Sequence, residues 1–430
     1  MTEQLEHNLP RFFRARQLFD TRQCSDIKKT VRMELERSGI ASQVGRGQSV
    51  AITAGSRGIT DIAQIIQATV AYFVELGAEP FIVPAMGSHG GGTAAGQRAV
   101  IESYGITEEF CGCPIRSSME TQVIGQAKEG FPVYFDRHAY AADHVVVCGR
   151  IKSHTNFAGD IQSGLMKMMM IGLGKKDGAA LYHQAIHEHG FPQIIRSVAP
   201  KVIEHANILV GLAIVENAND QTAHIEAALP ADFQARETEL LQLSKRLMPT
   251  LPFREIDLLI VDEIGKNISG TGMDTNVIGR KRSEKTAEQP TVEYIFVRNL
   301  TDETHGNASG IGFAEFCLTR VVESMDREAT VLNCLTALDV DGAKIPVYFA
   351  TDREALTRIL ALLGMKEPTD ARVVWIRNTG QLRELICSEA LMNEVRGTDG
   401  LQAITDPEFL SFDQVGMLPD DSFKMQDSAD

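Results

Sequence analysis

The chain has 430 residues, 43% of them hydrophobic and 23% charged, a composition typical of a soluble globular protein too long for one compact core. Its 57 acidic and 42 basic residues give a net charge of -15. This charge argues against nucleic acid and anionic membranes as partners, because no basic patch outweighs the acidic background. An anionic substrate would therefore need a local cationic pocket.

Targeting and membrane signals are not evident in the sequence. The first twenty residues lack the apolar core of a signal peptide, and no run reaches the roughly twenty apolar residues of a membrane span. The seven cysteines form an odd, scattered set, and Cys111 and Cys113 are too close together for a zinc knuckle. We therefore expect a cytoplasmic protein with reduced thiols.

Strand-like apolar runs alternate with helical periodicity along the N-terminal part of the chain, which is typical of α/β folds with mainly parallel sheets. The predicted strands are residues 49–53, 80–85, 143–148 and 208–215. The predicted helices are residues 61–76, 93–104 and 232–246.

The pattern restarts after residues 248–254, a segment with two prolines that is predicted to be a linker. Further strands are predicted at residues 257–261, 294–297 and 371–376. We therefore predict a Rossmann-like architecture of two α/β domains with an interdomain cleft. The predicted parts are an N-terminal cofactor-binding and catalytic domain (1–250), a C-terminal α/β domain (254–405) and an acidic C-terminal tail of little order (406–430).

Polar residues follow three of the predicted strands. Arg57, His89 and residues 152–154 each come just after an apolar run. In open α/β sheets, ligands bind at the carboxyl ends of the strands, where loops lead into helices. We therefore expect these residues to lie close together.

The first of these loops is the glycine-rich segment GSHGGGT, residues 87–93. Glycines let backbone N–H groups approach an anion, and Thr93 is placed to cap the following helix. No Gly-Lys-Ser/Thr follows and the spacing does not fit GxGxxG, so this is neither a Walker loop nor a dinucleotide-binding fingerprint. His89 is a candidate general base; the plain alternative is a tight turn from strand to helix.

Two cations are candidates for substrate binding. The guanidinium of Arg57 is able to hold a carboxylate through two parallel hydrogen bonds, although a loop arginine is more often a surface charge. Lys152 adds a second cation two residues before His154.

Lys167 stands alone in the apolar run SGLMKMMM. A buried lysine is costly to charge and is available as a nucleophile; alternatively, its ammonium reaches solvent. His183 and His187 are four positions apart, so on a helix they share one face and resemble half of a metal site. Histidine is also a usual ligand of nickel.

These elements occur in an order that resembles the family of nickel-pincer-nucleotide-dependent racemases and epimerases, typified by lactate racemase. The ordered set is Arg57 in a turn, His89 in Gly-Ser-His, His154 followed by Asn-Phe-Ala-Gly, and Lys167 with His183. The separation of sixteen positions from Lys167 to His183 fits the family pattern. The resemblance covers roughly the N-terminal two-thirds of the chain.

The resemblance implies a cofactor, a pyridinium-3,5-bisthiocarboxylic acid mononucleotide that holds nickel through carbon and sulfur. Lys167 would attach this nickel-pincer nucleotide covalently, and His183 would be the protein ligand to nickel. The host cell would need the enzymes that make the cofactor, which are therefore implied partners.

The resemblance also implies an isomerase, which inverts C2 of a small-molecule 2-hydroxy acid by hydride transfer to and from the cofactor, through a planar 2-oxo acid. His89 and His154 would alternate as acid and base, a task that suits the imidazole pKa. Arg57 would hold the carboxylate of the substrate. Lys152, which the resemblance does not imply, adds a second candidate cation for substrate binding.

Departures from the family pattern leave the substrate and the oligomeric state open. Ala54 stands where lactate racemase has an acidic residue, and the stretch between His154 and Lys167 is longer. No residue matches the second-domain lysine of that enzyme, for which the candidates are Lys266, Arg280 and Lys281. A sugar acid or a dicarboxylate is as compatible with this pattern as lactate.

Two other classes of function compete with the racemase hypothesis. One is a zinc- or iron-dependent hydrolase or lyase that uses His183, His187 and a distant carboxylate. The other is a non-catalytic module whose glycine loops bind a nucleotide or phosphate.

Overall fold

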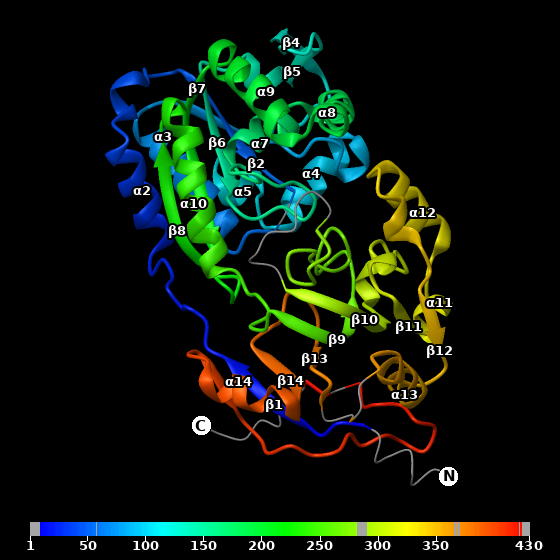
Figure 1. Ribbon diagram of the computed structural model, residues 1–430. Helices are drawn as coiled ribbons and strands as arrows, with labels where there is room; N and C mark the ends of the chain where they lie inside the picture. Colours follow the sequence, from blue (N-terminus) through cyan, green and yellow to red (C-terminus); the bar gives the residue numbers. More distant parts are fainter. Residues whose placement is uncertain are drawn as a thin grey trace. The chain divides into compact units, whose positions relative to one another are not determined.

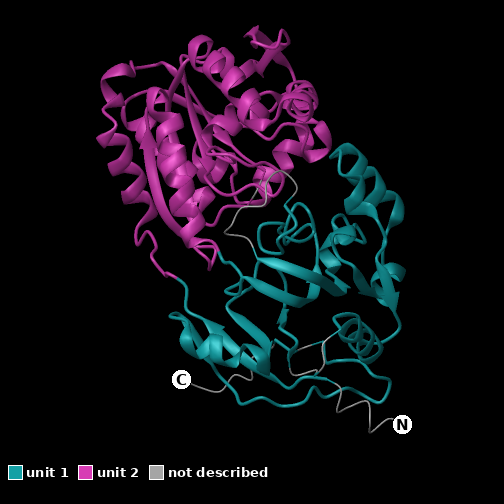
Figure 2. Cartoon of the chain, in the orientation of Figure 1, with its two compact units in different colours: residues 1–19, 249–430 teal, residues 20–248 magenta. Residues whose placement is uncertain are grey.

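The computed structural model describes residues 9–56, 58–281, 290–364, 367, 370–420 and 422–423. The chain divides into two compact units (Figure 2). Unit 1 comprises residues 1–19 and 249–430, and unit 2 comprises residues 20–248. No helix in these described ranges is long and apolar enough to cross a membrane.

Unit 2 is built on a five-stranded sheet in the order β3-β2-β6-β7-β8 (Figure 1). The strands are β2 (Ser49–Ala54), β3 (Glu79–Pro84), β6 (His144–Arg150), β7 (Ile208–Glu216) and β8 (Thr222–Ala228). The first four in spatial order are parallel, and β8 pairs antiparallel at one edge. Because helices cover both faces, the parallel strands are nearly continuous apolar runs.

Alternate residues of these strands serve two separate cores. Val146 points into the core shared with α2 and α3, while Val145 and Val147 point into the core shared with α7 to α10. The helices of unit 2 are α2 (Ile27–Arg37), α3 (Ile62–Glu75), α4 (Ala94–Ser103), α5 (Glu108–Cys111), α6 (Arg137–Tyr140), α7 (Leu165–Lys167), α8 (Lys175–His189), α9 (Phe191–His205) and α10 (Phe233–Leu247). The shorter elements are η1 (Ile40–Gln43), η2 (Gly90–Gly92), the π-helix η3 (Met168–Gly172), η4 (Pro230–Asp232) and the hairpin of β4 (Thr121–Gln126) with β5 (Pro132–Asp136).

Unit 1 is built on an eight-stranded mixed sheet in the order β12-β11-β10-β9-β13-β14-β1-β15. Its strands are β1 (Phe12–Gln17), β9 (Glu255–Ile264), β10 (Thr291–Leu300), β11 (Phe316–Leu318), β12 (Val347–Phe349), β13 (Val373–Ile376), β14 (Glu384–Ser388) and β15 (Leu401–Ala403). The five from β12 to β13 are parallel, and the last three are antiparallel. Its helices are α11 (Thr319–Glu323), α12 (Arg327–Thr336), α13 (Asp352–Leu362) and α14 (Met392–Gly397), with the short turns η5 (Asp302–Thr304), η6 (Ile311–Phe313), η7 (Val340–Ala343) and η9 (Glu389–Leu391).

The α/β class with mainly parallel sheets is confirmed. The sequence predicts the first residues within an N-terminal domain, whereas the structure joins residues 1–19 to unit 1. The reason is strand pairing: β1 lies between β14 and β15, so its partners are more than 350 residues away in the chain. A local pattern carries no information about such a partner.

The expected lack of order in the C-terminal tail is corrected for its described part. Leu418 is 3% exposed and belongs to the core of unit 1. Its carbonyl accepts a hydrogen bond from Arg298 (2.8 Å), and its N–H donates to Asp352 (2.8 Å). Arg298 is fully buried and is paired with both Asp352 (2.8 Å) and Asp262 (2.5 Å). One buried guanidinium thus links α13, the sheet and the C-terminal segment.

Replacing Arg298 by Met is expected to destabilise unit 1 by about 3–5 kcal/mol, because two buried carboxylates lose their partner. Trp375 is the only tryptophan of the chain and donates to Asp262 (2.6 Å), so its fluorescence during urea unfolding reports on this unit. As a control, Arg358→Met removes the exposed ion pair with Glu354 and should change stability by about 0.5 kcal/mol or less. Equal effects of the two substitutions would contradict the anchoring role.

Candidate active site in unit 2

The sheet of unit 2 has a topological switch point between β2 and β6. From β2 the chain crosses to β3 on one side, and it later returns to β6 on the other side, with all three strands parallel. Ligands bind at such a point, beyond the carboxyl ends of the strands. Ser56 follows β2, His89 follows β3, and residues 152–154 follow β6. The predicted site loops therefore leave the same edge of one sheet; Arg57 itself lies outside the described residues.

The loop after β3 holds His89 against the end of β2. The His89 ring is exposed, and its Nδ1 lies 2.5 Å from the Ser56 hydroxyl. Gly90 has a positive φ of 64°, and a Cβ there would lie 2.6 Å from the backbone of Gly96, so this turn requires glycine. The Thr93 hydroxyl accepts from the Gly96 N–H (3.1 Å), which confirms the predicted cap of α4.

The loop after β6 fixes the tautomer of His154. Its Nδ1 accepts hydrogen bonds from the backbone N–H groups of Asn156 (3.0 Å) and Phe157 (3.1 Å). Because a backbone N–H can only donate, Nδ1 carries a lone pair and the neutral ring carries its proton on Nε2. The backbone N–H of His154 donates to the Gln162 side chain (2.8 Å), and Lys152 forms an antiparallel β-bridge with Ser163. These contacts join the two ends of the loop.

Phe157 lies at the centre of the proposed site. Its ring stacks on His154 (centroids 4.2 Å apart) and on Phe191 (4.4 Å). The Lys167 ammonium lies 5.5 Å from the centroid of the Phe157 ring, within range of a cation–π interaction, and the His183 ring lies 6.4 Å away. The structure thus gathers His154, Lys167 and His183 around one aromatic ring. The only sequence signal for Phe157 is its place in Asn-Phe-Ala-Gly.

Lys167 sits where an α-helical turn changes to a π-helix. The half-buried Lys167 ends α7, and η3 begins at the next residue; π-turns are frequent at functional sites. The start of α7 is capped from another element, because Glu237 of α10 accepts the Met166 N–H (2.7 Å). Glu237 is 1% exposed, and burial raises its pKa to about 8.

His183 is on α8, with an exposed face. The surrounding protein nevertheless lowers its pKa, first by desolvation and then through the positive charge of Lys167. The imidazole is therefore neutral at neutral pH, the form that binds metal ions. His187 lies one turn further along α8 and is exposed. In the described part of the chain no group of three or more histidine, cysteine, aspartate or glutamate residues is arranged to hold a metal ion.

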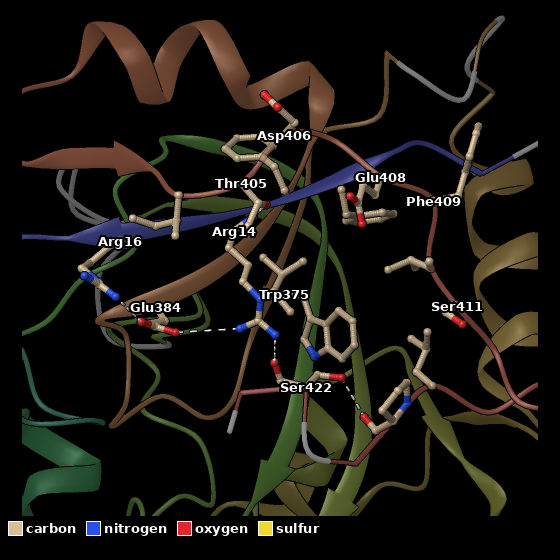
Figure 3. A pocket seen from close by; sticks show the side chains of 17 residues that line it. Arg14, Arg16, Trp375, Glu384, Thr405, Asp406, Glu408, Phe409, Ser411 and Ser422 are labelled. Atoms are coloured by element: carbon tan, nitrogen blue, oxygen red, sulfur yellow. Dashed lines mark hydrogen bonds and ion pairs between the residues drawn. The ribbon is translucent and has the colours of Figure 1, made fainter. Parts of the chain in front are cut away.

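Unit 1 contains a separate cavity of about 780 Å³ (Figure 3). It is lined by β1, β14 and the C-terminal segment, and no residue of the predicted site lines it. Arg14 donates to the Ser422 carbonyl (2.5 Å), and Arg16 pairs with Glu384 (3.0 Å), so both arginines of this cavity are engaged (Figure 3).

Comparison with known proteins supports the relationship that the sequence predicts. The family model described as the lactate racemase N-terminal domain matches residues 20–192. The matched segment includes every residue of the predicted site, from Arg57 to His183, and ends near the start of α9.

Among solved structures, the lactate racemase apoprotein from Thermoanaerobacterium thermosaccharolyticum is similar at 14% sequence identity, with a TM-score of 0.47. The alignment covers 87% of this chain and 85% of that one. No curated protein matches the chain in sequence.

Glu237→Gln is expected to remove a pH dependence from the stability of unit 2. The folded-state pKa of Glu237 is raised to about 8, so its protonated form stabilises the fold at low pH, and this contribution is lost as the pH rises through about 8. The free energy of unfolding should fall by about 4 kcal/mol between about pH 5 and pH 8.5 through this group. The variant keeps an oxygen that accepts from Met166 and should lack this fall. Urea titrations followed by far-UV circular dichroism measure it; identical pH slopes in the two proteins would contradict the assignment.

Phe157→Leu is expected to destabilise unit 2 by about 1–3 kcal/mol, because two aromatic stacking contacts and a cation–π contact are lost. Phe157→Tyr keeps the ring and serves as the matched control. In histidine-selective NMR spectra, the leucine variant should shift the ring resonances of His154, which lies on the face of Phe157, more than those of His205 at the surface. Unchanged His154 resonances would rule out the stacking role.

Proposed function

We propose that this protein is a racemase or epimerase that inverts C2 of a 2-hydroxy acid with a nickel-pincer nucleotide as cofactor. The observation that carries the proposal is the gathering of His154, Lys167 and His183 around Phe157 within the segment that matches the lactate racemase domain. A cofactor of this kind requires an amine for the covalent link, a neutral imidazole as metal ligand and an aromatic ring to stack on. Lys167, His183 and Phe157 supply these three groups close together.

The chemistry of these side chains fits the implied cofactor. Lys167 is half-buried and supplies an amine for the covalent link. The lowered pKa of His183 keeps its ring neutral, as a nickel ligand requires. When bound, the cofactor supplies the hydride acceptor and donor.

Proton transfer is assigned to His89 and His154, which differ in their hydrogen bonds. The Ser56 hydroxyl both donates and accepts, so it is compatible with either tautomer of His89, including the one with its lone pair on Nε2. His89 is therefore suited to take the proton of the substrate hydroxyl. His154 carries its proton on Nε2 and is suited to return one to the oxygen of the 2-oxo acid. For His154 to act as a base, its Nδ1 must first lose its two backbone donors.

Substrate binding is assigned to Arg57 and Lys152, which would hold the carboxylate. Lys152 follows β6 directly, and its N–H donates to the Ser163 carbonyl (3.1 Å), so its backbone is fixed beside His154. Since the chain has a net charge of -15, attraction of an anionic substrate depends on these local cations rather than on the overall field.

The cofactor assignment is tested on protein co-expressed with the enzymes that make the nickel-pincer nucleotide. Peptide mass spectrometry should find a mass increment on Lys167, and metal analysis should find nickel. Nickel should be lost in His183→Ala and kept in His187→Ala, a matched control one turn away on α8. Unmodified Lys167 without nickel, under conditions that load lactate racemase, would overturn the proposal. Activity restored by zinc and lost in both histidine variants would favour the hydrolase or lyase instead.

The catalytic assignment predicts that His89→Gln and His154→Gln each lower kcat by about 10²–10⁴, because each loses a proton-transfer group. Chiral chromatography of a panel of 2-hydroxy acids, with sugar acids and dicarboxylates included, measures the conversion. Nickel content should stay at the parent level in both variants. A histidine variant that keeps full activity with the best substrate would exclude that histidine as an acid or base.

A further inference from the structure

Lys175 is a buried cation that the proposed reaction does not use. Its side chain has no exposed surface, and burial lowers the pKa of its ammonium against the opposing effect of Asp136. The residue also adopts a left-handed backbone conformation, with φ of 54°, which a non-glycine residue rarely holds. Both features cost free energy, so the contacts of this side chain must offset them.

The ammonium of Lys175 contacts three different elements. It pairs with Asp136 at the start of α6 (3.1 Å) and donates to Gln97 of α4 (3.2 Å) and to the carbonyl of Pro84 at the end of β3. Two of these oxygens, on Gln97 and Pro84, accept hydrogen bonds from the ammonium, and the third, on Asp136, is held by charge as an ion pair. Asp136 and Gln97 are themselves fully buried, so these contacts are shielded from water.

Gln97 extends this network to the loop that carries His89. Its Nε2 donates to the carbonyl of Gly87 (2.7 Å) and also lies 3.4 Å from that of His89. The segment from Pro84 to His89 is therefore held at its start by Lys175 directly and near its end by Lys175 through Gln97. The same segment is also attached through the Ala85 N–H to the Ala54 carbonyl (2.8 Å), the Gly87 N–H to the Gly172 carbonyl (3.2 Å), and the His89 ring to Ser56.

Lys175 is also the first residue of α8, the helix that carries His183 two turns later. The same side chain thus connects the start of the His183 helix with the loop of His89. Asp136 completes the connection, because its other oxygen caps α6 through the Ala139 N–H (2.8 Å).

We propose that Lys175 is a positioning residue, which through Asp136 and Gln97 holds the His89 loop (residues 86–93) in register with the helix of His183. The consequence for catalysis rests on the function proposed above, whereas the positioning of the loop does not. The competing explanation is an ion pair that contributes only to overall stability, and a well-packed apolar replacement of such a pair is often tolerated.

Two variants separate these explanations. Lys175→Met combined with Asp136→Asn removes the charges without leaving one unpaired, and it keeps an oxygen for the cap of α6. Gln97→Leu leaves the ion pair in place and removes the hydrogen bonds that Gln97 makes to the loop and to Lys175. Lys201→Met, which removes a surface pair with Glu204 in the same unit, is the control.

Amide hydrogen exchange of the cofactor-free protein gives the deciding measurement. We expect peptides that cover the His89 loop to exchange about tenfold faster in both test variants, with β7 unchanged, because only local opening is affected. The loop exchanging at the parent rate in Gln97→Leu, or the loop and β7 accelerating equally, would overturn the proposal. If the double variant does not fold, Gln97→Leu decides.

The loaded enzyme gives the second readout. Both test variants should lower kcat by about 10–100-fold with little change in KM, because His89 is misplaced while the substrate contacts remain. Lys167 modification and nickel content should equal those of the parent. A loop that loosens in exchange while kcat stays at the parent value would refute the link to His89. Absence of activity in the loaded parent would instead refute the proposed function and leave the exchange result standing.

Discussion

The proposed site depends on the direction in which three neighbouring strands run. Because β2, β3 and β6 are parallel, their carboxyl ends meet at one edge of the sheet, and the reversal of strand order between β2 and β6 lets the loops of Ser56 and His154 diverge there. The loops that follow these three strands have little regular structure, but the ends of the strands fix where each loop begins. The hydrogen bond of His89 to Ser56 follows from this arrangement, since β3 lies on the other side of β2.

Much of this arrangement was predictable from local sequence, and the missing part is non-local. Apolar runs showed the parallel strands, and a threonine before a helical pattern showed the cap of α4. The buried lysine was not predictable, because Lys175 and Lys176 are adjacent and similar, while only the fold makes the first buried and the second exposed. The capping role of Glu237 was not predictable either, because the turn that it caps lies about 70 residues away in the chain. Strand β1 was not predicted for the same reason, because its partners β14 and β15 lie more than 350 residues away in the chain.

Buried charge has a common role in the two units. In unit 1, Arg298 links the sheet, α13 and the C-terminal segment, and in unit 2, Lys175 links a strand end and three helices. Each cation is desolvated at a cost that its carboxylate partners offset only when the geometry is complete. Such groups are a poor source of net stability. They are a strong source of specificity, since a displaced loop would leave a charge without its partner.

The two proposed proton-transfer histidines are held by different kinds of group, and this limits how a racemase could use them. Ser56 accommodates either tautomer of His89, while two backbone N–H groups hold His154 as a proton donor. Conversion of one enantiomer therefore begins with His89 as the base and conversion of the other with His154 as the base, and the hydrogen bonds favour the first arrangement. For a racemase, however, the two enantiomers have equal free energy, so kcat/KM must be the same for both. An inequality between the two directions can then appear only as a difference in kcat that an equal difference in KM compensates.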